Sequence, residues 1–255
     1  MRLCYFCLLL YRDNDMIRIL HTADWHLGQT FFGYDRTKEH EAFLDWLLRE
    51  IRKNEIDALI IAGDVFDVSN PSAASQRMYY EFIYRVTAEN PGLQIVIVAG
   101  NHDSAARLEA PLPLLQAMRT EVRGVVRKLN EGEIDYDHLA VELKNREGEV
   151  EVLCMAVPFL RQGDYPVVET EGNPYMEGVR ELYTQLLQRL WARRKTNQAI
   201  LAIGHLQATG SEIAEKDYSE RTVIGGLECV SPDTFSEKIA YTALGHIHKS
   251  QRVSG

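Results

Sequence analysis

Five short segments of the 255-residue chain carry aspartate, asparagine and histidine at spacings that suit metal-assisted chemistry. Each follows directly on an apolar run, and most open with glycine, which lets the chain turn sharply. The segments are Asp24-Trp25-His26, Gly63-Asp64-Val65-Phe66-Asp67, Gly100-Asn101-His102-Asp103, Gly204-His205 and Gly245-His246-Ile247-His248. Because α/β folds place functional groups where strands run out into loops, we predict that the five segments form one site.

The residue types in these segments are typical ligands of divalent cations. Asp24 and His26 are two residues apart, so their side chains point the same way on extended backbone, and the last two histidines repeat this geometry. With the carboxylate of Asp64 and the amide of Asn101 they form a mixed oxygen and nitrogen set, which suits Mn²⁺, Fe²⁺ or Zn²⁺. Two cations about 3.5–4 Å apart can clamp both the attacking and the leaving oxygen of a phosphoryl displacement.

Each segment alone also has an ordinary explanation. An Asp-x-His pair is usually solvated, a lone histidine often satisfies a backbone carbonyl, and Gly63-Asp64 could be only a turn. Gly100-Asn101-His102-Asp103 is much rarer by chance, given average residue usage. Five such segments in one chain, each after a strand-like run, are not accidental, and they favour a shared chemical role.

The composition limits the class of protein. With 45% hydrophobic and 25% charged residues the chain is typical of globular domains, and no apolar run approaches the ~20 residues that span a bilayer. The net charge of -9 argues against binding nucleic acid by bulk charge, but not against binding phosphates through metal ions. The four cysteines are too scattered for a disulfide framework, which favours a reducing, cytoplasmic setting.

Alternating strand and helix patterns would bring the segments together. The predicted strands are 17–21, 58–62, 94–99, 122–126, 138–143, 150–157, 199–203 and 239–244, and the predicted helices are 36–53, 72–90 and 179–190. Residues 161–174 lack periodicity and are predicted to form a surface loop. Strand–helix alternation followed by additional strands predicts a layered α/β sandwich.

Residues 1–15 differ from the rest of the chain. They contain an apolar run at 3–11 after a single Arg2, without the basic start and cleavage site of a signal peptide. Met16 immediately precedes the first strong strand. We expect residues 1–15 to be a leader, or to precede the natural start, and to be disordered.

In this order the five segments resemble the calcineurin-like metallophosphoesterase superfamily, whose pattern is D-x-H, G-D-x-x-D, G-N-H-[DE], G-H and G-H-x-H. Residues 20–28, 99–104 and Ser219-Glu220-Arg221 further resemble the bacterial nucleases that process DNA double-strand breaks. The resemblance covers residue 17 to the end. It implies an α-β-β-α sandwich and a DNA nuclease that uses two Mn²⁺ ions and acts with an ATPase subunit in repair, recombination and hairpin processing. It also implies 3′→5′ exonuclease action on duplexes and endonuclease action on single strands or hairpins.

The resemblance also implies a role for each residue of the site. One metal ion would be held by Asp24, His26, Asp64 and His248, and the other by Asp64, Asn101, His205 and His246. His102 would face the scissile phosphate and protonate the leaving oxygen, while Asp67 would hydrogen-bond His102 and keep its imidazolium oriented. Separately from the resemblance, the position of Arg107 just beyond this segment leads us to expect that it reaches the substrate backbone.

The ligands alone do not choose the phosphate ester. A phosphomonoesterase or small-molecule phosphodiesterase of the same superfamily would use the same residues, whereas a non-catalytic scaffold would require ligand losses, and none is evident. Members of the resembled family continue into a cap domain that grips duplex DNA and a segment that docks on the ATPase. We therefore expect residues 16–255 to be a catalytic domain without those two parts, able to dimerise through its early helices.

Overall fold

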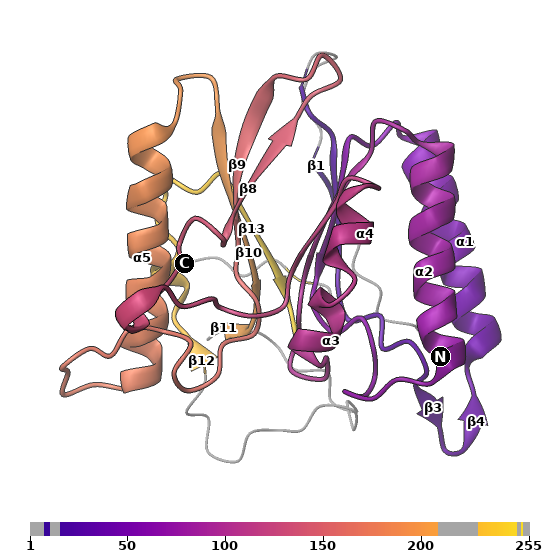
Figure 1. The fold of residues 1–255 in the computed structure, drawn as a ribbon, viewed down its shortest axis with the longest axis horizontal. Coiled ribbons are helices and arrows are strands. Elements are labelled where there is room, and N and C mark those ends of the chain that lie inside the picture. Colours follow the sequence, from indigo (N-terminus) through magenta and orange to yellow (C-terminus); the bar gives the residue numbers. More distant parts are fainter. Residues whose placement is uncertain (1–7, 11–15, 209–228, 249–250, 252–255) are drawn as a thin grey trace.

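The strands at Ala58–Ala62 and Ala199–His205 are buried on both faces, which requires a hydrophobic layer on each side of the sheets that contain them. The computed structural model describes residues 8–10, 16–208, 229–248 and 251, and its strands form two main sheets that pack face to face with helices outside them (Figure 1). The strand order is β1-β2-β5-β6-β7 in the first sheet and β13-β10-β9-β8 in the second. This arrangement confirms the predicted α-β-β-α sandwich.

The first sheet is formed by the amino-terminal half of the described chain. Its strands are β1 (Leu8–Leu10), β2 (Ile19–Thr22), β5 (Ala58–Ala62), β6 (Gln94–Val98) and β7 (Thr120–Arg123). All neighbours are parallel except β1, which runs antiparallel to β2. Its associated helices are α1 (Thr37–Lys53), α2 (Ala73–Glu89), α3 (Ala105–Glu109) and α4 (Leu112–Gln116), and β3 (Thr30–Phe31) and β4 (Tyr34–Asp35) form a small hairpin.

The second sheet is formed by the later residues. Its strands are β8 (Ala140–Lys144), β9 (Val150–Ala156), β10 (Ala199–His205) and β13 (Tyr241–Gly245). β9, β10 and β13 are parallel, and β8 pairs with β9 as an antiparallel hairpin. The long helix α5 (Pro174–Arg193) covers the outer face. The remaining elements are β11 (Gln207–Ala208), β12 (Cys229–Val230) and the 3₁₀ turns η1 (Asn130–Gly132) and η2 (Pro232–Thr234).

Alternation along the strands divides the apolar residues among three hydrophobic layers. In β5, Leu59 and Ile61 pack with the apolar faces of α1 and α2, while Ile60 lies in the layer between the two sheets. In β10, Ile200 packs with residues of α5, and Leu201 joins the layer between the sheets. The period of two thus places each sheet between a helical layer and the other sheet.

Two of the main helices begin at recognisable capping residues. The Ser72 side chain accepts a hydrogen bond from the backbone N–H of Ser75 at the start of α2. The Asn173 side chain accepts from the backbone N–H groups of Tyr175 and Met176 at the start of α5, with Pro174 in its first turn. Consequently α5 starts at residue 174, five residues before the apolar stripe that predicted it.

The structure differs from the sequence-based expectation at Leu8–Leu10 and at α3 and α4, and the strand predicted at 122–126 lies at Thr120–Arg123. Leu8–Leu10 is a strand rather than part of a disordered leader, because it pairs with the otherwise open edge of β2. Residues 1–7 and 11–15, and the Ser219-Glu220-Arg221 segment, lie outside the described residues. Helices α3 and α4 were not predicted, since five residues are too few to show a helical period.

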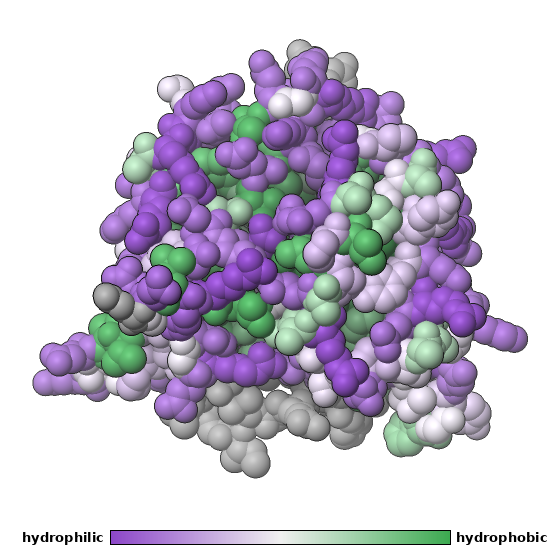
Figure 2. Space-filling model, viewed as in Figure 1, coloured by the Kyte–Doolittle hydropathy of each residue, from purple (hydrophilic) through white to green (hydrophobic). Residues whose placement is uncertain are grey.

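The packed layers bury most of the apolar side chains. The face shown in Figure 2 is mostly hydrophilic, and its hydrophobic residues form small separate patches. Within the described part of the chain, no helix has both the length and the apolar character needed to cross a membrane.

Candidate metal centre

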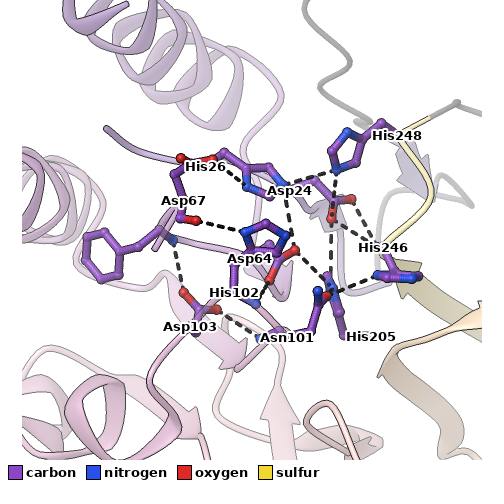
Figure 3. A network of polar contacts seen from close by, with 12 residues as sticks. Asp24, His26, Asp64, Asp67, Asn101, His102, Asp103, His205, His246 and His248 are labelled. Carbon is purple, nitrogen blue, oxygen red and sulfur yellow. Dashed lines mark hydrogen bonds and ion pairs between the residues drawn. The ribbon is translucent and has the colours of Figure 1, made fainter. Parts of the chain in front are cut away.

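The polar segments all follow the carboxyl ends of parallel strands. Asp24 and His26 follow β2, Asp64 follows β5, and Asn101 follows β6. From the second sheet, His205 ends β10, and His246 and His248 follow β13. Figure 3 shows the side chains of these residues pointing toward one another, although they come from strands of both sheets. The structure therefore brings together all seven residues that were predicted as metal ligands.

One group of ligand atoms lies around His26. Its Nε2 atom is 3.0 Å from Nε2 of His248 and 3.6 Å from Oδ2 of Asp64. Oδ1 of Asp24 lies 3.9 Å from Nε2 of His248. A ligand atom from each of Asp24, His26 and His248 can be chosen so that all lie within 4.8 Å of one another.

A second group lies on the other side of Asp64. Oδ2 of Asp64 is 3.3 Å from Nε2 of His205. Oδ1 of Asn101 is 2.9 Å from the same nitrogen and 3.1 Å from Nδ1 of His246. Asp64 lies beside both groups, which is the position that a bridging carboxylate requires.

The donor set fits divalent cations. Ligands at right angles around an ion, each about 2.1 Å from it, lie about 3 Å from one another, and the closest distances in the site have this value. In the described part of the chain, the ion pairs of Asp24 and Asp64 are with histidines alone, without lysine or arginine. Two nearly buried carboxylates without a permanent positive partner are costly, and bound cations would supply the missing charge.

The titration properties of the site reflect this excess of negative charge. Although burial opposes it, the carboxylates of Asp64 and Asp24 raise the pKa of His205 to about 9. The nearby histidines likewise overcome the effect of burial on Asp64 and lower its pKa. Burial raises the pKa of Asp24 against the effect of its neighbouring histidines. Burial and then the proximity of His205 lower the pKa of His246 to about 3, so its ring is neutral and available as a ligand.

The backbone of the site is held in an unfavourable conformation. Positive φ angles occur at Asp24 (57°), His26 (45°), Asp64 (49°) and His246 (93°). These four are among seven non-glycine residues with positive φ in the described chain, and each costs about 1–3 kcal/mol. Strain concentrated at the predicted ligands indicates that the fold sustains these conformations for the site.

Two glycines of the segments allow close approach at the centre. A Cβ on Gly100 would lie 2.1 Å from Oδ1 of Asp64, and a Cβ on Gly245 would lie 2.0 Å from the carbonyl oxygen of Ala62. Both distances are shorter than van der Waals contact allows. Glycine is therefore needed at position 100, which passes Asp64, and at position 245, which passes Ala62 at the end of β5.

His102 lies beside the two groups of ligands, but its contact with Asp67 differs from the expected one. Nδ1 of His102 donates to the backbone carbonyl of Asp67 at 2.8 Å, whereas the Asp67 carboxylate faces Nδ1 of His26 at 3.4 Å. The reason is the path of the loops, because a bridge between Leu27 and Phe66 lays the 26–29 segment beside the 64–67 segment. The side chain of Asp67 therefore orients His26, and its main chain orients His102.

Asp103 is a structural residue of the site for which no role was predicted from the sequence. Its buried carboxylate accepts backbone N–H bonds from Val65 (3.2 Å), Phe66 (2.9 Å) and Gly100 (2.9 Å). It thereby ties the loop after β5 to the loop after β6. Burial and the charge of Asp64 raise the pKa of Asp103 to about 6, although these three donors oppose the rise. The sequence signal for this role was the position of Asp103, a carboxylate directly after Asn101-His102 in a predicted site segment.

Two other residues near the segments have contacts away from the ligands. Arg107 is exposed on α3, and its Nη1 donates to Oδ1 of Asn70 at 2.7 Å. Trp25 is almost completely buried between the rings of Phe43 and Phe82, with ring centroids 5.8 Å and 5.4 Å away. Its place in the hydrophobic core leaves no face for stacking on a nucleobase.

Residues 17–250 match the model of the calcineurin-like phosphoesterase family. The chain belongs to this family. It is 39% identical to the SbcD subunit of the SbcCD nuclease from Rhodobacter capsulatus, over 94% of this chain and 60% of that protein. Identity to the proteins of the same name is 33% in Escherichia coli K12, over 94% and 58% of the two chains, and 29% in Bacillus subtilis 168, over 93% and 58%. The chain spans about 60% of the length of these curated relatives, and the family membership confirms the resemblance predicted from the five segments.

Proposed function

We propose that this chain is the catalytic domain of a metal-dependent DNA nuclease of the SbcD type, which hydrolyses phosphodiester bonds. The observation that carries the proposal is the convergence of two carboxylates, one amide and four imidazoles beside His102. The similarity of the chain to proteins named as the D subunit of the SbcCD nuclease also supports the proposal.

The proposed ligand sets are those of the two groups of side chains. One divalent ion would be held by Asp24, His26, Asp64 and His248, and a second by Asp64, Asn101, His205 and His246. Mixed carboxylate and imidazole ligands suit Mn²⁺, which we propose as the ion. When bound, such ions offset the charge of the phosphodiester and make a water molecule acidic enough to act as the nucleophile.

The chain's own residues position the proton donor. The backbone N–H of His102 donates to Oδ1 of Asp64 at 2.9 Å, so its main chain is fixed to the shared carboxylate. The Asp67 carbonyl holds Nδ1 of the ring, which leaves Nε2 for the substrate. In its protonated form His102 gives the Nε2 proton to the departing oxygen. Asp67 thus acts as a positioning residue for both His102 and His26.

The proposed substrate and partner are supported by the names of the relatives rather than by the ligands. We propose DNA as substrate, with 3′→5′ exonuclease action on duplexes and endonuclease action on hairpins or single strands, and an SbcC-type ATPase as partner in DNA repair in the cytoplasm. Arg107 is exposed beside the His102 loop, where it can contact a phosphate of the strand. A homodimer formed through the early helices belongs to the same proposal.

The test compares DNA with a simple ester. A labelled duplex, a labelled hairpin and 4-nitrophenyl phosphate are each incubated with Mn²⁺ and the wild type, Asp64→Asn or Asp45→Asn. Asp45 is a surface residue paired with Arg85 at 2.8 Å and serves as the matched control. We expect Mn²⁺-dependent cutting of DNA by the wild type and Asp45→Asn, and none by Asp64→Asn. Rapid turnover of the monoester without cut DNA would establish a phosphomonoesterase instead. A melting temperature that does not change on adding Mn²⁺, with no hydrolysis of any substrate, would indicate a non-catalytic scaffold.

A further inference from the structure

A pocket of about 630 Å³ lies between β9 and α5, and its lining includes part of residues 161–174, which were predicted only as a surface loop. Its lining includes Phe159, Arg161, Gln162, Tyr165, Asn173 and Tyr175. The volume is in the range of sites that bind small molecules or single groups of a larger ligand. In Figure 1 this segment runs from the carboxyl end of β9 to the start of α5, at the edge of the sheets where the metal centre lies.

Phe159 joins the pocket to the metal centre. Its backbone N–H donates to the carbonyl of Ala99 at 2.8 Å, immediately before Gly100 and Asn101. Its ring meets the ring of His205 edge to face, with centroids 6.3 Å apart. One wall of the pocket is therefore in contact with a proposed metal ligand, His205.

The other walls supply a cation and more aromatic surface. The exposed guanidinium of Arg161 lies over the ring of Phe159, with Cζ 5.2 Å from the centroid. Across the described residues, this guanidinium forms no ion pair, so its charge is available to an anion. The half-buried rings of Tyr165 and Tyr175 meet edge to face at 5.4 Å.

This combination is the one that binds nucleotides without regard to sequence. Bases stack on aromatic rings and on guanidinium planes, and arginine also binds the phosphates of the strand. An apolar peptide would gain nothing from the free guanidinium, whereas a nucleotide uses both the flat surface and the charge. The exposed face of the Arg161–Phe159 pair offers the position for a base.

We infer that this pocket binds the nucleoside attached to the scissile phosphate, its base stacked on the Arg161–Phe159 pair. The inference rests on the proposed function, because it takes the phosphate to be held beside His102. The inference adds a subsite that binds one nucleoside of the strand. Such a subsite distinguishes nucleic acid from simple phosphodiesters.

The experiment uses two esters with the same leaving group, thymidine 5′-(4-nitrophenyl) phosphate and methyl 4-nitrophenyl phosphate. The quantity compared is the ratio of their kcat/KM values with Mn²⁺, in the wild type, Arg161→Ala and Phe159→Leu. Base stacking is worth roughly 1–3 kcal/mol, so the ratio should fall about 5- to 150-fold, mainly through KM of the thymidine ester. The methyl ester should be hydrolysed as before by Arg161→Ala.

Arg194→Ala is the matched control, because Arg194 also lies over an aromatic ring, that of Trp191 at 4.7 Å, but at the opposite end of α5. Its ratio should equal that of the wild type. If Phe159→Leu slows the hydrolysis of both esters equally, the substitution has disturbed His205. The ratio measured for Arg161→Ala, whose side chain contacts no proposed ligand, then decides whether the subsite exists. Hydrolysis of both esters with an unchanged ratio in Arg161→Ala would overturn the subsite and leave the proposed function standing. If the wild type cuts the labelled duplex but hydrolyses neither ester, one nucleoside is not enough for binding and the subsite is overturned. If it cuts no DNA either, the proposed function itself fails.

Discussion

The two sheets contribute different chemistry to the same site. The loops of the first sheet supply both carboxylates and the amide, together with His26 and His102, whereas the second sheet supplies only the imidazoles of His205, His246 and His248. Negative charge is therefore concentrated on one side of the site. Three of the four predicted ligands with positive φ, Asp24, His26 and Asp64, also belong to the first sheet.

This difference shows that the centre depends on how the sheets pack against each other. Each sheet has its own helical layer, but their site residues meet only across the layer between them. Nδ1 of His205 lies 2.8 Å from the carbonyl of Ala62, and the backbone N–H of His246 donates to Oδ1 of Asp24 at 3.0 Å. The imidazoles of the second sheet are thus aligned by hydrogen bonds to a backbone carbonyl and a carboxylate of the first sheet.

The largest expected effect comes from the carboxylate that both ligand groups share. Asp64→Asn should lower hydrolysis of DNA by about 10³-fold or more and abolish the rise in melting temperature on adding Mn²⁺, because it weakens both ion sites. His246→Gln, in the second sheet, changes one group only, and more Mn²⁺ should restore part of its activity. Titration of both variants with Mn²⁺, followed by activity and differential scanning fluorimetry, checks the contrast. Equal rescue of the two variants would contradict a shared role for Asp64.

A second effect separates the proposed proton donor, His102, from the proposed ligands of the first sheet. His102→Gln should lower cleavage of DNA by about 10²–10⁴-fold, since the departing sugar oxygen needs a proton. A nitrophenyl diester loses a stable anion, so its hydrolysis should fall far less. The rise in melting temperature with Mn²⁺ should persist, because His102 is not a proposed ligand. If both substrates slow equally and the Mn²⁺ response disappears, His102 holds metal instead.

A third, smaller effect tests the packing between the sheets. Gly245→Ala places a Cβ against the Ala62 carbonyl and should push β13 from β5, lowering stability by about 1–3 kcal/mol and activity by about tenfold. Gly92→Ala is the control, because a Cβ there meets nothing within 4 Å. Chemical denaturation and the hydrolysis rate measure the two changes. Wild-type activity in Gly245→Ala would mean that the site tolerates movement between the sheets.

The smallest expected effect concerns Glu109, which joins the first sheet to the segment that leads to the second. It accepts from Nε2 of His138 (3.2 Å) and the N–H of Gly124 (3.1 Å) and pairs with Arg127 (3.3 Å). Although burial opposes the shift, these partners lower the pKa of Glu109 from 4.5 to about 2. Its stabilising effect is therefore complete above pH 4.5 and is lost as the pH falls toward 2.

The free energy of unfolding of the wild type should fall between pH 4.5 and pH 2, and in Glu109→Gln this fall should be about 1–2 kcal/mol smaller. Urea denaturation of the metal-free protein across this window measures it. Glu41→Gln, an exposed glutamate on α1, is the control and should follow the wild type. Identical pH profiles for Glu109→Gln and the wild type would show that the network adds nothing to stability.

Much of the fold and the convergence of the site could be predicted because the signals are local. β5 and β6 are continuous apolar runs, and each ends in glycine followed by a polar ligand. Such runs predict buried parallel strands, and parallel strands align their carboxyl ends. The order of the segments therefore indicated which side chains meet, while occupancy by metal stays a prediction.

The remaining features depend on contacts between distant parts of the chain. Asp67 is near both His26 and His102, and the Leu27–Phe66 bridge decides which of them its carboxylate faces. The strand at Leu8–Leu10 exists through its pairing with β2. Phe159 lies beside His205, and its backbone N–H bonds to the carbonyl of Ala99, a contact that no local sequence pattern predicts.

The contact between Asp24 and His246 joins residues 222 positions apart. During synthesis the carboxylates of the first sheet emerge long before the imidazoles of β10 and β13, so a growing chain has no complete set of ligands. The proposed hydrolytic activity therefore requires that nearly all of the described domain has left the ribosome. The order of the segments along the chain thus delays completion of the predicted ligand set until β13 has been synthesised.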